Sequence, residues 1–106
     1  MIDEVFVNEK LYCDEDITIK RLADHLDVTQ QHFSAYLNHH LNVNFNTFIN
    51  RYRIKESIEI MNDEPERSLL SIAFAVGFNS KSVFYEAFTK EIGLSPARFR
   101  KEKNLK

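Results

Sequence analysis

The chain has 106 residues, the length of one domain, and its hydrophobic content of 43% with nine Phe is ample for a core. With only two Gly and two Pro, helices are expected and a turn-rich β fold is disfavoured. No run approaches the roughly 18 apolar residues that a membrane span needs, so no membrane contact is expected. The formal net charge of −2 speaks against a nucleic-acid binder, but the first 16 residues hold six acids and one base, which leaves the remainder basic.

The first half of the chain is predicted to be helical. Residues 3–12 are expected to form a short helix that packs on the helices after it. A second helix is expected after Thr18, whose side chain can accept a hydrogen bond from a first-turn N–H group. Thr29 is expected to begin a third helix over residues 29–41, and Asn42 to end it. The predicted inward residues of this third helix are Phe33, Tyr36, Leu37 and Leu41.

Residues 45–61 form the longest periodic run and carry apolar side chains on two sides. A helix of that kind is usually buried between two bodies, so residues 45–61 are predicted to be a connector helix between two lobes. Residues 62–68 are expected to form a polar loop, because Pro65 interrupts a continuous helix.

The second half repeats the apolar spacing of the first at an offset of 50 residues, which becomes 51 beyond the turn. Gly77 is expected to end one helix with a positive φ, and Asn79 or Ser80 to begin the next, over residues 80–92. The residues predicted to point inward on that helix are Val83, Phe84, Ala87, Phe88 and Ile92. The repeat predicts one domain, 1–106, with helix-turn-helix lobes at 15–44 and 68–101.

Three segments resemble the DNA-binding domain of the AraC/XylS transcription regulators: LADHLDVTQQHFSAYLNHHLNVNF, FINRYRIKES and SIAFAVGFNSKSVFYEAFTKEIGLSPARFR. The last follows the family pattern of I-A, G-F, S-x-F, F-K, G and S/T-P-x-x-[FY]-R almost throughout, with Thr89 in place of the Lys. The resemblance implies an all-α fold of about seven helices, with two homeodomain-like helix-turn-helix subdomains joined by a long connector helix. It also implies sequence-specific binding of double-stranded DNA, with two recognition helices in successive major grooves, by a bacterial cytoplasmic transcription regulator.

On helix 29–41 the resemblance assigns Gln31, Ser34 and Ala35 to base-facing positions and Asn38 to a neighbouring backbone contact. Gln and Asn suit adenine edges, because an amide pairs a donor with an acceptor. Taken without the repeat and the resemblance, the same residues would be an ordinary solvated helix face.

On helix 80–92 the corresponding outward residues are Lys81, Ser82, Tyr85 and Glu86. Lys81 lies near a helix N-terminus, where it suits a phosphate or a guanine, or it is a plain surface lysine. Tyr85 either packs on a sugar or thymine methyl group or is partly buried. Family members often carry Arg where this chain has Ala35 and Glu86. The Glu86 carboxylate can accept from a cytosine amino group or repel phosphate, and both interpretations stay open.

Three further cations are candidate phosphate ligands. For Arg53, in the connector, a phosphate contact and a structural ion pair across the lobes are equally open. For Arg98 and Lys101 the alternative is a charged C-terminal face.

Four histidines (His25, His32, His39 and His40) raise the question of a metal site. His32 and His39 are two helical turns apart, so they cannot share an ion as an i, i+4 pair does. No metal, cofactor or catalytic motif is expected, and Cys13, the single cysteine, fits a reducing cytoplasm. The chain is not predicted to be an enzyme.

Ala35, Glu86 and the overall acidity support one alternative function, a protein-interaction module with the same fold that has lost DNA binding. We expect the chain to be the C-terminal part of a longer regulator with a sensor or dimerisation domain. The isolated domain is expected to be a monomer.

Overall fold

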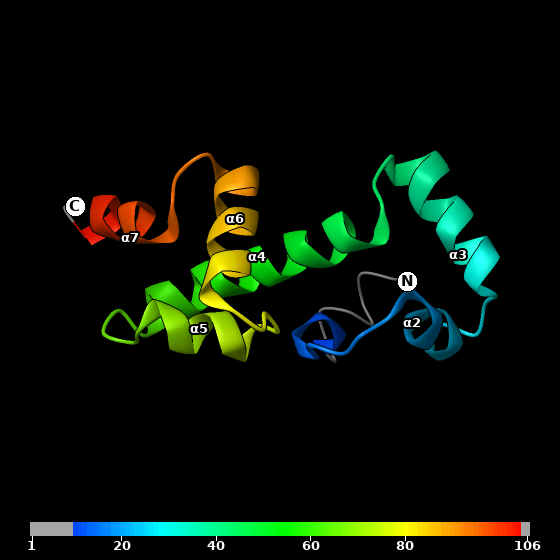
Figure 1. Ribbon diagram of the computed structural model, residues 1–106, viewed down its shortest axis with the longest axis horizontal. Coiled ribbons are helices and arrows are strands. Elements are labelled where there is room, and N and C mark those ends of the chain that lie inside the picture. Colours follow the sequence, from blue (N-terminus) through cyan, green and yellow to red (C-terminus); the bar gives the residue numbers. More distant parts are fainter. Residues whose placement is uncertain (1–9, 105–106) are drawn as a thin grey trace.

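The computed structural model describes residues 10–104 of the chain. Within that range lie six α-helices, two short helical segments and no strand. The body is elongated, 46 × 23 × 23 Å, and helix α4 (Phe45–Asp63) runs along its middle (Figure 1). The predicted all-α class is confirmed. The helix expected over residues 3–12 lies mostly outside the described residues, and its described end is a 3₁₀ turn, η1 (Leu11–Cys13).

The first lobe consists of η1, the N-terminal half of α4 and three elements between them. These are α2 (Ile19–His25), α3 (Gln30–Tyr36) and η2 (Leu37–Leu41). The rings of Phe33 and Phe48 meet edge to face with their centroids 6.1 Å apart. The buried core of this lobe is Tyr12, Leu22, Ala23, Phe33, Leu37, Phe48 and Ile49.

The second lobe packs α5 (Leu69–Ala75), α6 (Lys81–Ile92) and α7 (Pro96–Asn104) on the C-terminal half of α4. In α6 the rings of Phe84 and Phe88 lie 5.8 Å apart at 71°. The buried core is Ile54, Met61, Ile72, Ala73, Val76, Phe78, Phe84 and Phe88. Because α4 contributes to both cores, its apolar residues on two sides are explained by the two lobes that it joins.

The internal repeat is visible in the backbone. Asp27 and Gly77 follow α2 and α5 with positive φ angles of 60° and 106°. In each copy the N–H of the next residue donates to a carbonyl five residues earlier, Ala23 O and Ala73 O, both at 3.0 Å. This is the hydrogen bond that closes a helix ending in a left-handed residue. The two helix-turn-helix copies therefore turn in the same way, 50 residues apart.

The helix starts are fixed by hydroxyl side chains. Thr18 accepts from the Arg21 N–H at 3.1 Å, and Thr29 accepts from the His32 N–H at 3.0 Å. In the second copy Ser80, and not Asn79, begins α6. Each cap satisfies one of the N–H groups that a first turn leaves without a backbone partner.

Three residues predicted to face inward are exposed instead: Tyr36 by 37%, Leu41 by 42% and Val83 by 47%. Tyr36 is the last residue of α3. For Leu41 the reason is η2, a π turn in which the N–H of Asn42 donates to Leu37 O. A π turn holds one residue more than an α turn, so its side chains leave the α-helical spacing that the prediction assumed. Val83 lies in the first turn of α6 and is turned away from the core.

Candidate nucleic-acid interface

The outward side of α3 and η2 carries the first set of predicted contact residues. They line one depression that is open to solvent, together with two further residues: Gln30, Gln31, Ser34, Ala35, Asn38 and His39. Ser34 is half-buried and the others are exposed. Ala35 has no side-chain atom beyond Cβ, so it leaves room among the longer amide side chains. The structure thus brings all four predicted residues of this helix onto one face, which we call the first recognition face.

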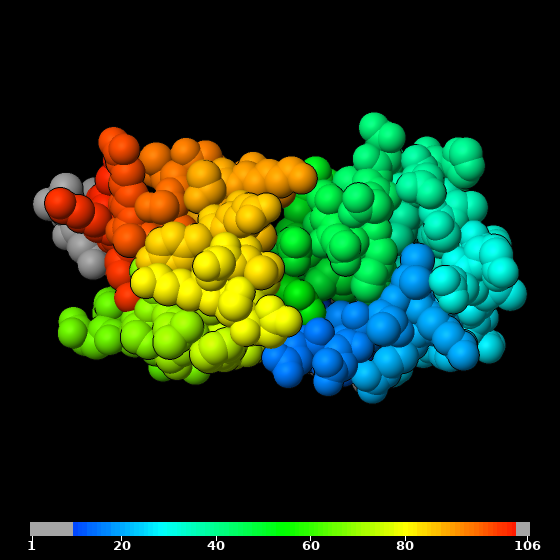
Figure 2. Space-filling view, in the orientation of Figure 1, coloured from blue at the N-terminus to red at the C-terminus, as the bar shows by residue number. Residues whose placement is uncertain are grey.

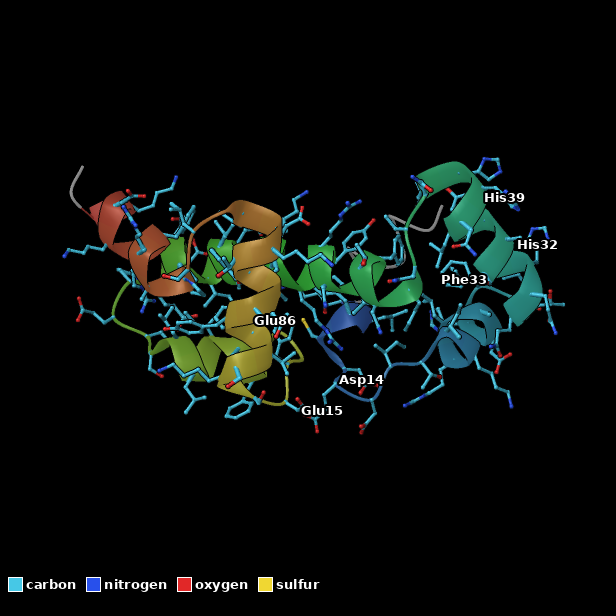
Figure 3. The ribbon with its side chains drawn as sticks, turned by 45° about the horizontal axis from the view of Figure 1, so that its top comes forward. Asp14, Glu15, His32, Phe33, His39 and Glu86 are labelled. Atoms are coloured by element: carbon cyan, nitrogen blue, oxygen red, sulfur yellow. The ribbon has the colours of Figure 1, made fainter. Side chains whose placement is uncertain are left out.

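His39 lies on the first recognition face, although the sequence suggested it only as a candidate metal ligand. It lies in η2, four residues after Ala35, and lines the same depression. In Figure 3 His32 and His39 lie on the outer side of the helix, whereas Phe33 points into the lobe. The spacing was visible in the sequence and could have assigned His39 to this face.

The chemistry of the first recognition face is that of neutral hydrogen-bonding groups. Residues 30–41 contain no Lys, Arg, Asp or Glu. Amide side chains can donate and accept at once, so this face is suited to the edges of bases more than to phosphates.

The outward residues of α6 form a second recognition face, made of Lys81, Ser82, Tyr85 and Glu86. Lys81, Ser82 and Glu86 are exposed, and Tyr85 is half-buried. The Lys81 ammonium lies 5.2 Å from the centroid of the Tyr85 ring. That ring packs in turn against Phe84, at 6.1 Å and 79°. A cation over an aromatic ring is attracted to it, so Tyr85 holds Lys81 at the start of α6.

Glu86 lies on the outer side of α6 (Figure 3). This face therefore carries a cation and a carboxylate five residues apart, whereas the first recognition face has no Lys, Arg, Asp or Glu. It can donate to a phosphate through Lys81 and accept from a base through Glu86.

Arg53 lies between the two lobes and on neither recognition face. Its Nε donates to Tyr12 O at 2.6 Å, and its Nη2 donates to Asp14 O at 3.0 Å. The guanidinium lies 5.4 Å from the centroid of the Phe78 ring. Burial lowers the pKa of this guanidinium from its usual range. These hydrogen bonds run to backbone carbonyls of the first lobe, where the sequence left open a phosphate contact or an ion pair across the lobes.

Gly77 completes this joint between the lobes. A Cβ atom at Gly77 would lie 2.8 Å from Arg53 Nε and 2.8 Å from Tyr12 O. Glycine is therefore required here both by the positive φ of 106° and by close packing. In Figure 2 the N-terminal segment of the first lobe, in blue, meets the yellow segment of the second lobe below α4.

Arg98 and Lys101 are exposed on α7, at the end of the molecule opposite to α3 (Figure 1). The Arg98 N–H donates to Ser95 Oγ at 3.2 Å, which fixes the start of the helix. The neighbouring Arg100 has two buried atoms, Nε and Nη2, that meet no acceptor within the described part of the chain. The structure does not bring these α7 residues together with those of the recognition faces.

Some other cations of the described range are held in ion pairs. Lys10 Nζ lies 2.9 Å from Glu56 Oε2, and Arg51 Nε lies 3.3 Å from Glu91 Oε1. Among residues 10–104 no group of three or more His, Cys, Asp and Glu side chains is placed to hold a metal ion. No helix in that range is long and apolar enough to cross a membrane.

Comparison with known proteins places these features in context. A family model described as a helix-turn-helix domain matches residues 22–102. The melibiose operon regulatory protein of Escherichia coli K12 is 30% identical over 88 residues, which are 83% of this chain and 29% of that protein. The transcriptional regulatory protein HptR of Staphylococcus aureus is 26% identical over 105 residues, which are 94% of this chain and 41% of that protein. The chain thus spans well under half the length of these two relatives.

Two solved structures show the same fold. The C-terminal domain of AraT, a response regulator from Geobacillus stearothermophilus, superposes with a TM-score of 0.80 at 24% identity, covering 95% of this chain and 84% of that one. A DNA-binding transcriptional dual regulator from Escherichia coli K-12 gives a TM-score of 0.83 at 16% identity, covering 99% and 90%.

Proposed function

The chain belongs to the AraC/XylS family of transcription regulators and has the family's DNA-binding domain, and on that premise we propose that both of its lobes read double-stranded DNA at once. In this proposal α3 with η2 enters one major groove and α6 enters the next. The observation that carries the proposal is the repeat itself. Two equivalent turns each present a helix with an outward polar face, one in each of the two lobes that the connector joins.

The dimensions of the body support the proposal. Successive major-groove sites on one side of B-form DNA are about 34 Å apart. The long dimension of 46 Å accommodates two helices at that separation. In Figure 1 α3 and α6 both stand across the direction of α4, with α3 beyond one end of α4 and α6 crossing it nearer the middle.

Individual roles follow from the chemistry of the two faces. We assign Gln31, Ser34 and Ala35 to base edges in the first groove, with Asn38 on the adjoining backbone. In the second groove the assigned base-facing residues are Lys81, Ser82, Tyr85 and Glu86. Arg98 and Lys101 are assigned to phosphates next to the second lobe. Arg53 is assigned to the joint between the lobes, because its donors are bonded to Tyr12 O and Asp14 O.

The relatives named above are regulators and not enzymes, and neither these relatives nor the fold favours the alternative of a protein-interaction module. We further propose that the domain acts in the cytoplasm of a bacterium, that it is a monomer in isolation, and that a sensor or dimerisation domain accompanies it in a longer regulator.

The proposal is tested by selecting binding sites from a library of randomised duplexes at low salt, followed by fluorescence titration of the selected sites. We expect an enriched sequence that the domain binds in preference to the starting library. Each phosphate contact adds about 0.9 to the slope of log affinity against log salt concentration, and few cations lie on the two faces, so a slope shallower than about −6 is expected. Absence of any enriched sequence would overturn the proposal.

A further inference from the structure

Histidine is the only source of positive charge on the first recognition helix. Of the four histidines, His32 lies in α3, and His39 and His40 lie in η2. The same helix contains no Lys, Arg, Asp or Glu. Whether this helix carries positive charge is therefore decided by imidazole protonation alone.

Among these three histidines, His39 differs in its placement. It lines the depression between Gln31, Ala35 and Asn38, whereas His32 and His40 do not. The ring of His40 packs instead against Tyr36, with the ring centroids 5.1 Å apart. Of the three, His39 is thus the one that lines the first recognition face.

We propose that His39 is a further DNA-contacting residue, and that its protonation strengthens DNA binding as the pH falls from 8 towards 5. This inference rests on the proposed function, because it adds a contact to the same face. Histidine is the side-chain type that changes charge between about pH 5 and 8. A neutral imidazole has one N–H donor, whereas an imidazolium has two and a positive charge.

The gain is expected to be large for this face because the face is otherwise neutral. The remaining lining residues (Gln30, Gln31, Ser34, Ala35 and Asn38) carry no formal charge. A protonated His39 would therefore be the one cation among the six lining residues, and its hydrogen bond to a phosphate oxygen would be charge-assisted. A lobe that reads base edges at alkaline pH would also attract the DNA backbone at acidic pH.

Other ionisable groups on the packed elements do not line the depression. On α3 and η2 these are His32, Tyr36 and His40. On α2, which packs against α3, they are Lys20, Arg21, Asp24 and His25, and Asp27 follows in the turn. Histidine is the side-chain type among them that changes charge between about pH 5 and 8, so the experiment must isolate His39 from the other histidines.

The test is a set of fluorescence titrations of one library-selected duplex at pH 8.0 and pH 5.5 and constant ionic strength. The proteins are the wild type, His39→Gln, and His40→Gln as the matched control from the same turn. Glutamine keeps a donor and an acceptor but cannot become charged. We expect the wild type and His40→Gln to gain about tenfold in affinity at pH 5.5, the effect of one charge-assisted hydrogen bond. His39→Gln should lose most of that gain.

A second readout separates a phosphate contact from a structural effect. If His39 meets a phosphate, the salt slope of the wild type should steepen by about 0.9 at pH 5.5 and that of His39→Gln should not. Equal gains in the wild type and His39→Gln, or loss of the gain in His40→Gln, would overturn the inference while the proposed function stands. If the wild type binds no duplex at either pH, the proposed function fails and the inference fails with it.

Discussion

The two lobes follow one backbone plan and present different chemistry. The recognition helix of each begins at a hydroxyl cap, Thr29 or Ser80, and α3 and η2 together match the 12 residues of α6. The first ends in a π turn at Asn42, with φ of 54°, and the second in a regular turn at Gly93, with φ of 92°. The first face is neutral apart from its histidines, whereas the second carries Lys81 and Glu86.

This difference shows which positions define the fold and which define recognition. Buried equivalents, such as Phe33 and Phe84, are kept as large apolar groups because they fill the two cores. Outward equivalents, such as Ala35 and Glu86, share nothing but their position. We therefore expect the first lobe to contribute mainly base discrimination and the second to contribute the salt-dependent part of affinity.

The largest expected effect, on the free energy of unfolding, comes from removing one large buried side chain from the core of either lobe. Phe33→Ala and Phe84→Ala remove equivalent rings that are 1% and 0% exposed. Each should lower the free energy of unfolding by about 4 kcal/mol, because a buried ring is replaced by a cavity. Urea unfolding followed by circular dichroism measures both. A difference between the two variants of more than about 2 kcal/mol would show that the lobes are not equivalent in packing.

The next effect distinguishes the two glycines that end helices. Gly77→Ala should cost about 3 kcal/mol, because it combines a strained positive φ with a Cβ atom 2.8 Å from Arg53 Nε and Tyr12 O. Gly93→Ala is the matched control, since its φ is 92° and no atom lies within 4 Å of the added Cβ. It should cost about 1 kcal/mol. Equal costs in thermal or urea unfolding would contradict the close joint at Gly77.

Replacing Arg53 tests whether this cation of the connector helix stabilises the joint between the lobes or contacts DNA. Arg53→Gln should lower the free energy of unfolding by about 2 kcal/mol, because Tyr12 O and Asp14 O lose a charged donor. Arg51→Gln removes only a surface pair with Glu91 and should cost less than about 1 kcal/mol. If Arg53→Gln leaves stability unchanged but flattens the salt dependence of DNA binding, the architectural assignment is wrong.

Single substitutions by Ala, outside both cores, compare what the two recognition faces contribute to DNA binding. Gln31→Ala and Lys81→Ala should each weaken DNA binding by about 1–2 kcal/mol with nearly unchanged thermal stability. Lys81→Ala should also reduce the salt slope by about 0.9, whereas Gln31→Ala should relax base preference at constant slope. Unaltered affinity in both variants would mean that other faces meet the DNA.

The smallest effect is an alkaline loss of stability at Cys13. Burial raises the pKa of this thiol, so the folded state keeps its proton where the unfolded chain has lost it. The resulting stabilisation is complete below the ordinary thiol pKa of about 8.5 and is lost as the pH rises above it. Cys13→Ser should therefore lose less stability than the wild type between pH 8 and 9.5 in urea unfolding. Parallel pH profiles of the two proteins would contradict this assignment.

Sequence patterns predicted the backbone plan well because the relevant signals are local. Thr18 and Thr29 were correctly predicted as caps, and Gly77 as a helix end with positive φ, because each acts through its own backbone neighbourhood. The connector was predicted over residues 45–61 and extends to Asp63, since an apolar pattern defines a helix interior better than its last turn.

What the sequence did not predict depends on contacts between distant residues. The π turn of η2 moves Leu41 out of the core, and no local sequence pattern predicts that turn. The partners of Arg53 are carbonyls about 40 positions earlier, so a motif that contains Arg53 cannot show them. The family resemblance assigns Gln31, Ser34, Ala35 and Asn38 to the first recognition face, whereas His39 is placed there by the structure.

The central claim, that two lobes read one duplex in successive major grooves, is tested most directly by guanine methylation protection on a library-selected duplex. The N7 atom of guanine lies in the major groove, so its protection reports which grooves are filled. Two protected blocks are expected on one side of the duplex, about 10 base pairs apart from centre to centre. A single protected block, or two blocks on opposite sides of the helix, would contradict the claim.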